Sequence, residues 1–315
     1  MTIRLGYQIP NFTYPGVAEQ DLFATVAAQA REAETAGFDT VLVMDHFYQL
    51  PGIGTPDMAM LEAYTTLGAL ASATSTIQLS ALVTGNTYRN PALTAKAVTT
   101  LDVVSRGRAI LGIGAGWFER EHHDYGFEFG SFAERFEKLE EALTIIAPML
   151  RGEPASLEGK WYTARGAMNN PRVREKIPIM LGGSGEKKTF RLAARFADHM
   201  NVICDVADLP HKLGVLRQRC EEAGRDPATL PTSYLTMGLV GEDEREVKEM
   251  AARVPEDRRA RVFLGSVDQV AEQIHERVIG AGIDGITINL IANGHRPGMV
   301  SQVGAALKPV VGISG

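Results

Sequence analysis

The stretch IQLSALVTGNTYRNPALTAKAVTTLDVVSRGRAILGIGAGW, residues 77–117, contains the signals of a complete strand–helix–strand unit. The apolar run IQLSALVT predicts a buried strand, and Pro91 suits the start of a helix from about Ala92 to Val104. The tetrapeptide SRGR predicts a turn into a second strand, RAILGIG. Two buried strands joined by a helix are typical of parallel pairing.

The same unit repeats on both sides of this stretch. We expect eight strands, at residues 3–9, 40–46, 77–84, 108–114, 177–181, 199–203, 233–240 and 285–290. We expect helices between them, at 19–36, 59–73, 92–104, 132–150, 187–197, 209–223, 244–252, 267–280 and 300–307. Continuous apolar runs such as VLVM and IPIML indicate strands that helices cover on both faces.

Eight parallel strands close into a barrel without leaving an edge, so the fold class that we predict is α/β, a (β/α)8 TIM barrel. A doubly wound sheet usually has fewer strands and a dinucleotide fingerprint in its first turn, where this chain has IPNFTYPG. The length of 315 residues is near that of one barrel with insertions, and we expect one domain over residues 1–315. Two ordinary domains are the alternative.

Two segments exceed the bare repeat. Residues 117–130, WFEREHHDYGFEFG, follow strand four as a polar and aromatic loop, and we expect them to help form the pocket. Residues 151–176 precede strand five. Within them SLEGKWYT predicts a hairpin that turns at Glu158 and Gly159 and runs over the side of the barrel as a lid.

Composition excludes several classes of partner. The net charge is −6 and no long basic run is present, which argues against nucleic acid and anionic membranes. The chain begins MTIRLGYQIPNF, without a signal peptide, and no stretch is apolar for long enough to span a bilayer, so we expect a cytoplasmic protein without a membrane partner. Its two cysteines, Cys204 and Cys220, lack metal-ligand spacing.

A glycine-rich turn between strand five and the next helix predicts a phosphate site. The turn consists of Gly182, Gly183, Ser184 and Gly185. Its glycines leave backbone N–H groups unobstructed, and the positive end of the following helix attracts an anion. Three basic residues would strengthen this field: Lys187, Lys188 and Arg191. The alternative is a turn that needs glycine only for its backbone geometry.

Polar residues follow strands two and three at the end of the barrel where active sites lie. Asp45 and His46 end strand two, and His46 is the candidate acid/base residue because imidazole changes charge near neutral pH. Thr84 and Asn86 could hydrogen-bond a flat polar ring. Their alternative roles are structural: a histidine bonded to a neighbouring loop, and two turn residues.

Other motifs do not carry chemistry. The GIGAG run that ends at Gly116 is followed by WFEREHH rather than by a small-residue helix start, so we interpret its glycines as room for a ligand near the backbone or as relief of crowding. His122 and His123 lie in a solvated loop rather than a metal site, because adjacent histidines point apart. We therefore expect no metal. The chain contains neither a P-loop lysine pair nor a GxSxG nucleophile motif.

Taken in order, five segments resemble the bacterial luciferase-like flavin and deazaflavin oxidoreductases. They are the Asp45-His46 pair, VTGNTYRNPA, LDVVSRGRAILGIGAGW, the GGSG turn and the closing AGIDGITINL. The resemblance covers nearly the whole chain and is greatest to oxidoreductases that depend on coenzyme F420. It implies a barrel with an inserted lid, a homodimer, and hydride transfer between F420 and a small organic substrate.

The resemblance also implies roles for individual residues. Asp45 and His46 would lie near the ring and the substrate, Thr84 and Asn86 would contact the polar edge of the ring, and Gly116 would let the cofactor approach the backbone. The Ala81-Leu82 peptide matches the place where family members often carry a non-proline cis bond that supports the ring. The GGSG turn, Gly182 to Gly185, would hold the cofactor phosphate.

One departure bears on the substrate. Sugar-phosphate dehydrogenases of the family resemble GTGE where this chain has GAGW, so Trp117 replaces the expected acid. Phe47, Trp117 and Tyr125 could form an apolar pocket wall, or simply fill space at the barrel mouth. Three alternatives to an F420 enzyme remain at this point: an FMN-dependent monooxygenase, a cofactor-storage protein without turnover, and a cofactor-independent sugar-phosphate barrel.

Overall fold

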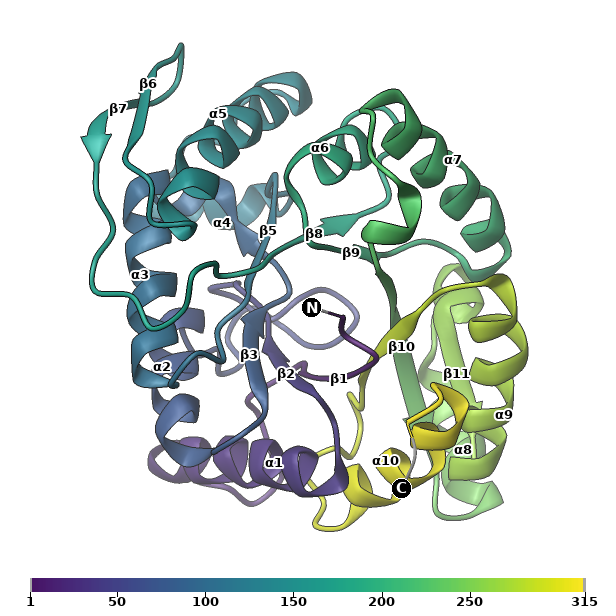
Figure 1. Ribbon diagram of the computed structural model, residues 1–315. Coiled ribbons are helices and arrows are strands. Elements are labelled where there is room, and N and C mark those ends of the chain that lie inside the picture. Colours follow the sequence, from purple (N-terminus) through teal and green to yellow (C-terminus); the bar gives the residue numbers. More distant parts are fainter. Residues whose placement is uncertain (1, 314–315) are drawn as a thin grey trace.

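The computed structural model describes residues 2–313, except for the side chain of residue 257, and contains a closed parallel barrel surrounded by helices (Figure 1). The barrel strands are β1 (Leu5–Ile9), β2 (Thr40–Val43), β3 (Gln78–Ala81), β5 (Leu111–Gly114), β8 (Ile179–Gly183), β9 (His199–Val202), β10 (Thr232–Val240) and β12 (Gly285–Asn289). Leu79 pairs with Ala109 and so closes β3 onto the start of β5. The predicted (β/α)8 TIM barrel is confirmed.

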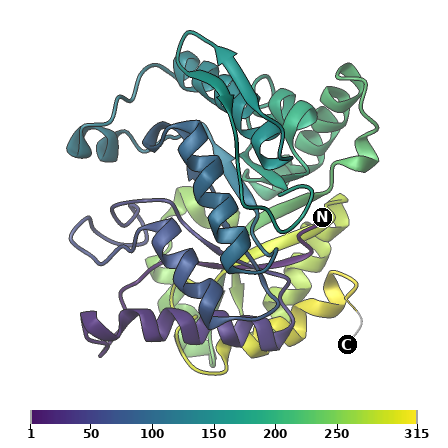
Figure 2. The same ribbon diagram turned by 60° about the vertical axis from the view of Figure 1, so that its left-hand side comes forward.

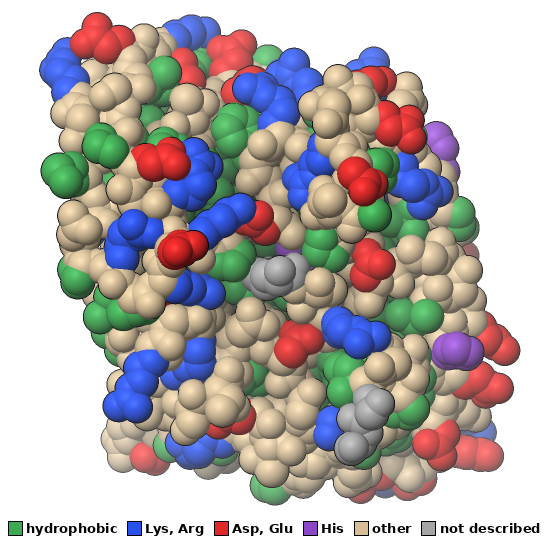
Figure 3. Space-filling view, in the orientation of Figure 1, with side chains coloured by type: hydrophobic (Ala, Val, Ile, Leu, Met, Phe, Trp, Pro, Cys, Tyr) green, Lys and Arg blue, Asp and Glu red, His purple; other side chains and the backbone are tan. Residues whose placement is uncertain are grey.

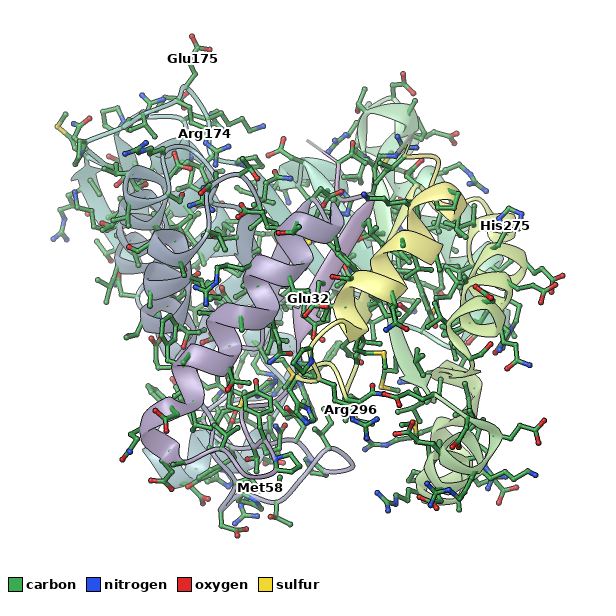
Figure 4. All side chains as sticks on the ribbon, turned by 90° about the horizontal axis from the view of Figure 1, so that it is seen from below. Glu32, Met58, Arg174, Glu175, His275 and Arg296 are labelled. Atoms are coloured by element: carbon green, nitrogen blue, oxygen red, sulfur yellow. The ribbon has the colours of Figure 1, made fainter. Side chains whose placement is uncertain are left out.

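Helices cover the outside of the barrel. They are α1 (Leu22–Ala36), α2 (Ala63–Ala73), α3 (Pro91–Val104), α5 (Phe132–Leu150), α6 (Thr189–Phe196), α7 (Leu209–Glu222), α8 (Glu244–Arg253), α9 (Val267–Arg277) and α10 (Met299–Val310). The first and last helices lie side by side in Figure 4, where Glu32 of α1 accepts a hydrogen bond from the backbone N–H of Ser301 at 2.8 Å. This contact joins the two ends of the repeat.

Local signals explain where the helices begin and end. The Asn90 side chain accepts a hydrogen bond from the Ala92 N–H at 2.9 Å, and Pro91 occupies the first helical position of α3. At the start of α5, Ser131 and Glu134 form a reciprocal capping box. Gly37 ends α1 with a φ of 84°, a conformation that glycine adopts without strain.

Alternation along the strands divides the core into two parts. Val41 and Val43 of β2 belong to the large cluster between barrel and helices, whereas Leu42 between them belongs to a smaller cluster. The smaller cluster fills the inside of the barrel and consists of Ile3, Leu42, Leu82, Ile110 and Met180. Strands that are buried on both faces explain why their sequences are continuously apolar.

Several elements differ from the sequence prediction. Residues 117–130 are not only a loop, because they contain a short helix, α4 (Glu119–Tyr125). A further parallel strand, β11 (Val262–Gly265), pairs with β10, and the expected third strand is interrupted before a two-residue strand, β4 (Thr84–Gly85). The sequence around β11 is short and lies between two helices, which left no clear alternating pattern to detect.

The position predicted for the cis peptide was wrong by one residue. The non-proline cis bond joins Leu82 to Val83 rather than Ala81 to Leu82. The N–H of Leu82 still donates to the Val43 carbonyl at 2.8 Å, so the ladder between strands two and three continues through Leu82. The chain therefore departs from the strand only after that residue.

The predicted hairpin is present as β6 (Ala155–Glu158) and β7 (Thr163–Ala167), which pair antiparallel around a turn at Gly159. It lies beside α5 at the outside of the barrel (Figure 1). The carboxylate of Glu141 on α5 accepts hydrogen bonds from three successive backbone N–H groups, those of Lys160, Trp161 and Tyr162. Its place at the side agrees with the prediction, and closure as a lid stays a prediction.

The figures locate the two ends of the barrel. In Figure 2 the loop after β2 and the α4 segment project on the side away from the N-terminus, where the strands have their carboxyl ends. In Figure 4 Met58 and Arg296 mark this end, and Arg174 and Glu175 mark the opposite one. Figure 3 shows basic and acidic side chains interspersed over the face around the N-terminus. Within residues 2–313, no helix is long and apolar enough to cross a membrane.

Candidate functional site

His46 lies just past the end of β2 and is held by a buried carboxylate from α4. Its Nδ1 is 2.9 Å from Oε2 of Glu121, and the His46 side chain is 13% exposed while that of Glu121 is fully buried. The same carboxylate accepts hydrogen bonds from the backbone N–H groups of Phe47 and Tyr48 and from the hydroxyl of Tyr88. One buried acid thus fixes the chain after β2, the histidine and a tyrosine.

The ionised carboxylate of Glu121 decides which ring nitrogen of neutral His46 carries the proton. Burial opposes a charge on Glu121, but the hydrogen bonds from His46, the Tyr48 N–H and Tyr88 outweigh it and lower the pKa of the carboxyl. An ionised carboxylate only accepts hydrogen bonds, so the proton of the neutral imidazole belongs on Nδ1. Nε2 of His46 has no hydrogen-bond partner among the residues that the structure describes, which leaves it free for a ligand.

Asp45 is buried and bonded to the segment after β3. Its two carboxylate oxygens receive both terminal nitrogens of Arg89, at 2.7 and 2.9 Å, and the backbone N–H of Gly85 at 2.9 Å. Arg89 also donates to Glu62 at 2.6 Å. Burial disfavours the charge on Arg89, yet the hydrogen bonds and charge of Asp45 raise its pKa above the ordinary value. Asp45 therefore holds the segment after β3 in place, and its contact with a cofactor stays a prediction.

The polar residues after β3 are buried beneath the mouth. The Thr84 hydroxyl is 2.7 Å from that of Tyr64, and the Asn86 amide approaches the Tyr162 hydroxyl of the hairpin at 3.5 Å. The carbonyl of Leu82 accepts a hydrogen bond from Gln8 at 3.2 Å. Ala81 ends β3 and is buried. The predicted residues are thus together, and their contact with a ring stays a prediction.

The glycine-rich turn offers free backbone donors. The N–H groups of residues 184–187 make no hydrogen bond within the described part of the chain. Gly183 has a φ of +133°, which side-chain-bearing residues rarely adopt, and a Cβ on Gly182 would lie 2.6 Å from Cγ1 of Val83. Lys188 precedes α6 without a side-chain cap. The backbone geometry and the unbonded donors are compatible with an anion cradle, and phosphate binding at this turn stays a prediction.

The charge around this turn is smaller than the sequence suggested. Arg191 lies 2.8 Å from Glu140 of α5, a carboxylate that also pairs with Arg195, so the Arg191 guanidinium is held toward α5. Lys187 is exposed and Lys188 partly buried, and neither forms an ion pair within residues 2–313. Two lysines rather than three basic residues therefore remain for an anion.

Aromatic residues surround the histidine. The ring of Trp117 lies edge-on to His46 with centroids 5.7 Å apart, and Trp117 is 60% exposed. Phe47 packs between Tyr88 and Tyr125, at 4.7 and 4.6 Å. Trp117 is therefore available to a ligand, whereas Phe47 chiefly fills the space between β2 and the α4 segment.

The two adjacent histidines have different roles, and the expectation of a solvated loop was wrong for one of them. His122 is buried in α4, with Nε2 at 2.7 Å from the Thr87 hydroxyl and Nδ1 at 2.9 Å from the Phe118 carbonyl, whereas His123 is exposed. Gly116, at a φ of +80°, lies close to Thr87. The described residues hold no group of three or more His, Cys, Asp or Glu side chains arranged around a metal position.

Sequence reasoning missed Glu121 and Arg89. Glu121 lies three positions after Phe118, in helical register with it, so treating residues 117–130 as helical would have placed an acid on the buried face. Arg89 carries no such signal, because its partners Asp45 and Glu62 come from other strands and helices.

Replacing Glu121 with glutamine is expected to lower stability near neutral pH and to flatten its acid dependence. Because the pKa of Glu121 is lowered in the folded protein, its carboxylate stabilises the fold fully above the ordinary pKa, and this contribution is lost as the pH falls through the lowered value. We expect a loss of about 1–3 kcal/mol at about pH 7 and a smaller difference at about pH 4. Thermal unfolding of both proteins at the two pH values measures this, and parallel pH profiles would contradict it.

The carboxyl ends of the strands carry the histidine, the buried polar residues and the anion cradle, which is where α/β barrels have their active sites. The sequence pattern of the luciferase-like monooxygenases matches residues 3–261. The chain therefore belongs to the luciferase-like monooxygenase family.

Individual relatives include enzymes with named activities. The chain is 33% identical over 240 residues to the F420-dependent glucose-6-phosphate dehydrogenase of Nakamurella multipartita, covering 75% of this chain and 69% of that one. It is 36% identical over 169 residues to the enzyme of the same name from Microbacterium testaceum, covering 53% of this chain and only about half, 48%, of the relative. The stretch shared with the latter is thus partial.

Solved structures share the fold. The F420-dependent tetrahydromethanopterin reductase of Methanopyrus kandleri superimposes with a TM-score of 0.80 at 20% identity, over 98% of this chain and 99% of that one. The EDTA monooxygenase of Chelativorans superimposes with a TM-score of 0.82 at 16% identity, over 98% and 94%. At these identities the likeness shows the barrel fold alone.

Proposed function

We propose that this protein is an oxidoreductase that transfers a hydride between coenzyme F420 and a small organic substrate. The observation that carries the proposal is the set of N–H groups after Gly183 at the carboxyl end of the barrel that make no hydrogen bond within the described residues, next to Lys187 and Lys188, which form no ion pair there. The named activities of the two dehydrogenase relatives support F420 as the cofactor.

The residues at the mouth fit such a cofactor. The turn provides room and donors for a phosphate, because no side chain projects from its glycines. Buried Thr84 and Asn86, with the carbonyl of Leu82 bonded to Gln8, form a polar floor between β1 and β3. A flat ring with a polar edge would lie over this floor, between His46 and the turn.

Bound F420 would supply or accept the hydride. His46 would hold or move the accompanying proton at Nε2, since Nδ1 is committed to Glu121. Glu121 would keep the imidazole oriented and stabilise its protonated form. Trp117 would cover the reacting atoms and exclude water from one side.

A second candidate is an FMN-dependent monooxygenase that takes up reduced flavin and uses oxygen. Monooxygenases such as the EDTA enzyme share the fold, and a phosphate cradle serves either cofactor. The dehydrogenase relatives favour F420, because they match this chain at 33–36% identity, above the 16% of that monooxygenase.

A paired titration separates these candidates. We expect the purified protein to bind F420, followed by its fluorescence, at least about tenfold more tightly than FMN, and to consume no oxygen with either reduced cofactor beyond the spontaneous oxidation measured without protein. Tighter binding of FMN with oxygen consumption would establish the monooxygenase instead. Binding of F420 without turnover of any carbonyl or alcohol substrate would indicate a storage protein.

The substrate is not a sugar phosphate in this proposal. Trp117 replaces the acid of the GTGE pattern, and Arg89, the buried cation nearest to Asp45, is already bound by two carboxylates. A carbonyl or alcohol is the reacting group of the substrate that suits this mouth better. The homodimer, the cytoplasmic location and the single domain stay predictions.

A further inference from the structure

A cavity of about 350 Å³ lies at the edge of the mouth, apart from His46. Its walls come from the residues after β4, from Glu128 between α4 and α5, from α5 and from the turn of the β6–β7 hairpin. The residues that bear on its chemistry are Arg89, Glu128, Lys138, Trp161 and Tyr162. The cavity therefore joins four segments, and the one after β4 also reaches the candidate site, because the Tyr88 hydroxyl donates to Glu121.

The ion pair in this cavity is asymmetric. Nζ of Lys138 lies 2.7 Å from Oε2 of Glu128, but the lysine side chain is only 9% exposed whereas that of Glu128 is 71% exposed. The Lys138 ammonium also lies 4.7 Å from the ring centre of Trp161. A buried ammonium requires an anion, while an exposed carboxylate returns to water at little cost.

Arg89, the other cation named for the cavity, cannot exchange its carboxylate partners in this way. Arg89 is bound bidentately by buried Asp45 and a second time by Glu62. In the part of the chain that the structure describes, Lys138 is thus the cavity cation whose partner a ligand can replace without leaving a buried carboxylate unpaired.

We propose that this cavity binds a carboxylate of the ligand, which replaces Glu128 on Lys138 while the ligand stem packs against Trp161 and Tyr162. The proposal rests on the proposed function for the source of that carboxylate. It comes either from the γ-linked glutamate tail of F420 or from an acidic group of the substrate.

A cofactor tail that starts at the phosphate turn would have to reach the cavity. Lys188, next to the turn, has its ammonium 5.8 Å from the ring centre of Phe136, and Phe136 precedes Lys138 by two residues on α5. Residues two positions apart on a helix face different sides, so a flexible anionic tail would run from the turn around the first turns of α5 to reach the cavity.

The test replaces each member of the ion pair in turn, and the two replacements should change the affinity for a carboxylate ligand in opposite directions. The probe is γ-glutamylglutamate, followed by the fluorescence of Trp161 in a Trp117→Phe background, since the chain has two tryptophans. We expect Lys138→Met to weaken binding by about tenfold or more and Glu128→Gln to strengthen it several-fold, because the first removes the cation and the second removes its competitor.

Lys160→Met is the matched control. Lys160 lies 4.4 Å from the same Trp161 ring but is 64% exposed and paired with Glu137, so its removal takes away an equal charge without changing the cavity. We expect less than about a twofold change. Glu128→Gln alters a surface side chain, so the test holds even if Lys138→Met fails to fold. Weakened binding in Glu128→Gln, or no fluorescence response in the parent protein, would overturn the proposal.

Binding measurements with F420 and with a deazaflavin that lacks the glutamate tail identify the source of the carboxylate. If the F420 tail supplies it, Lys138→Met weakens F420 with several glutamates but not the tail-free deazaflavin. If the substrate supplies it, the variant binds both cofactors normally and still loses the dipeptide. Should the protein bind no F420 at all while the dipeptide responses persist, the proposed function fails and the anion site stands.

Discussion

His46→Ala is expected to slow hydride transfer by about 10²- to 10⁴-fold, the usual contribution of a positioned acid or base. Cofactor affinity should change by less than about threefold, because the anion cradle around Gly183 lies on β8 and not on the strand that carries His46. Single-turnover oxidation or reduction of F420, followed by absorbance with a carbonyl or alcohol substrate, measures the rate separately from binding.

His123→Ala is the control for this prediction. His123 is exposed and lies 3.9 Å from the exposed carboxylate of Glu119, so its removal leaves the site intact. Unchanged turnover of a true substrate in His46→Ala would remove the histidine from the mechanism.

Gly183→Asp is expected to weaken cofactor binding by about a hundredfold. The substitution places a negative charge where the free N–H groups of residues 184–187 would hold a phosphate. It also forces a side chain onto a backbone with φ +133°, although space is available, since the nearest atom to an added Cβ is 3.5 Å away. Fluorescence titration with F420 measures the loss.

Gly183→Asn separates charge from backbone strain. Asparagine has nearly the size of aspartate and imposes the same strain without the charge. We expect it to bind the cofactor about tenfold more tightly than Gly183→Asp does. This difference in affinity should become smaller as salt is added. Equal affinities in the two variants would assign the effect to strain, and wild-type affinity in Gly183→Asp would contradict the cradle.

The barrel and the position of the glycine turn could be predicted from sequence because both depend on local signals. Apolar runs at strand length, a proline at the start of α3 and glycines at the turn after β8 act over a few residues. Once eight such units follow one another, closure is the arrangement that buries every strand edge. The hairpin at Gly159 followed from the same kind of local signal.

Errors arose where a local pattern was weak or a neighbour decided the outcome. The segment 117–130 looked like a polar loop because its helix buries a glutamate and a histidine instead of apolar residues. The sequence places Arg191 beside the anion site, but Glu140 of α5 binds its guanidinium. In both cases the partner is distant in sequence. A charged residue that is paired in the folded protein therefore cannot be told from an unpaired one in the sequence.

The sequence by itself determined the order of strands and helices, the closed barrel and the glycine turn, since hydrophobic periodicity and backbone conformation are properties of neighbouring residues. Tertiary structure alone decided that Glu121 holds His46, that Asp45 binds Arg89 and that Lys138 lies buried against Trp161 with an exposed partner. Some of these groups lie on elements far apart in the chain, as Glu121 and His46 do across 75 positions. Their distances, burial and ionisation exist only once the barrel has closed and excluded water from between them.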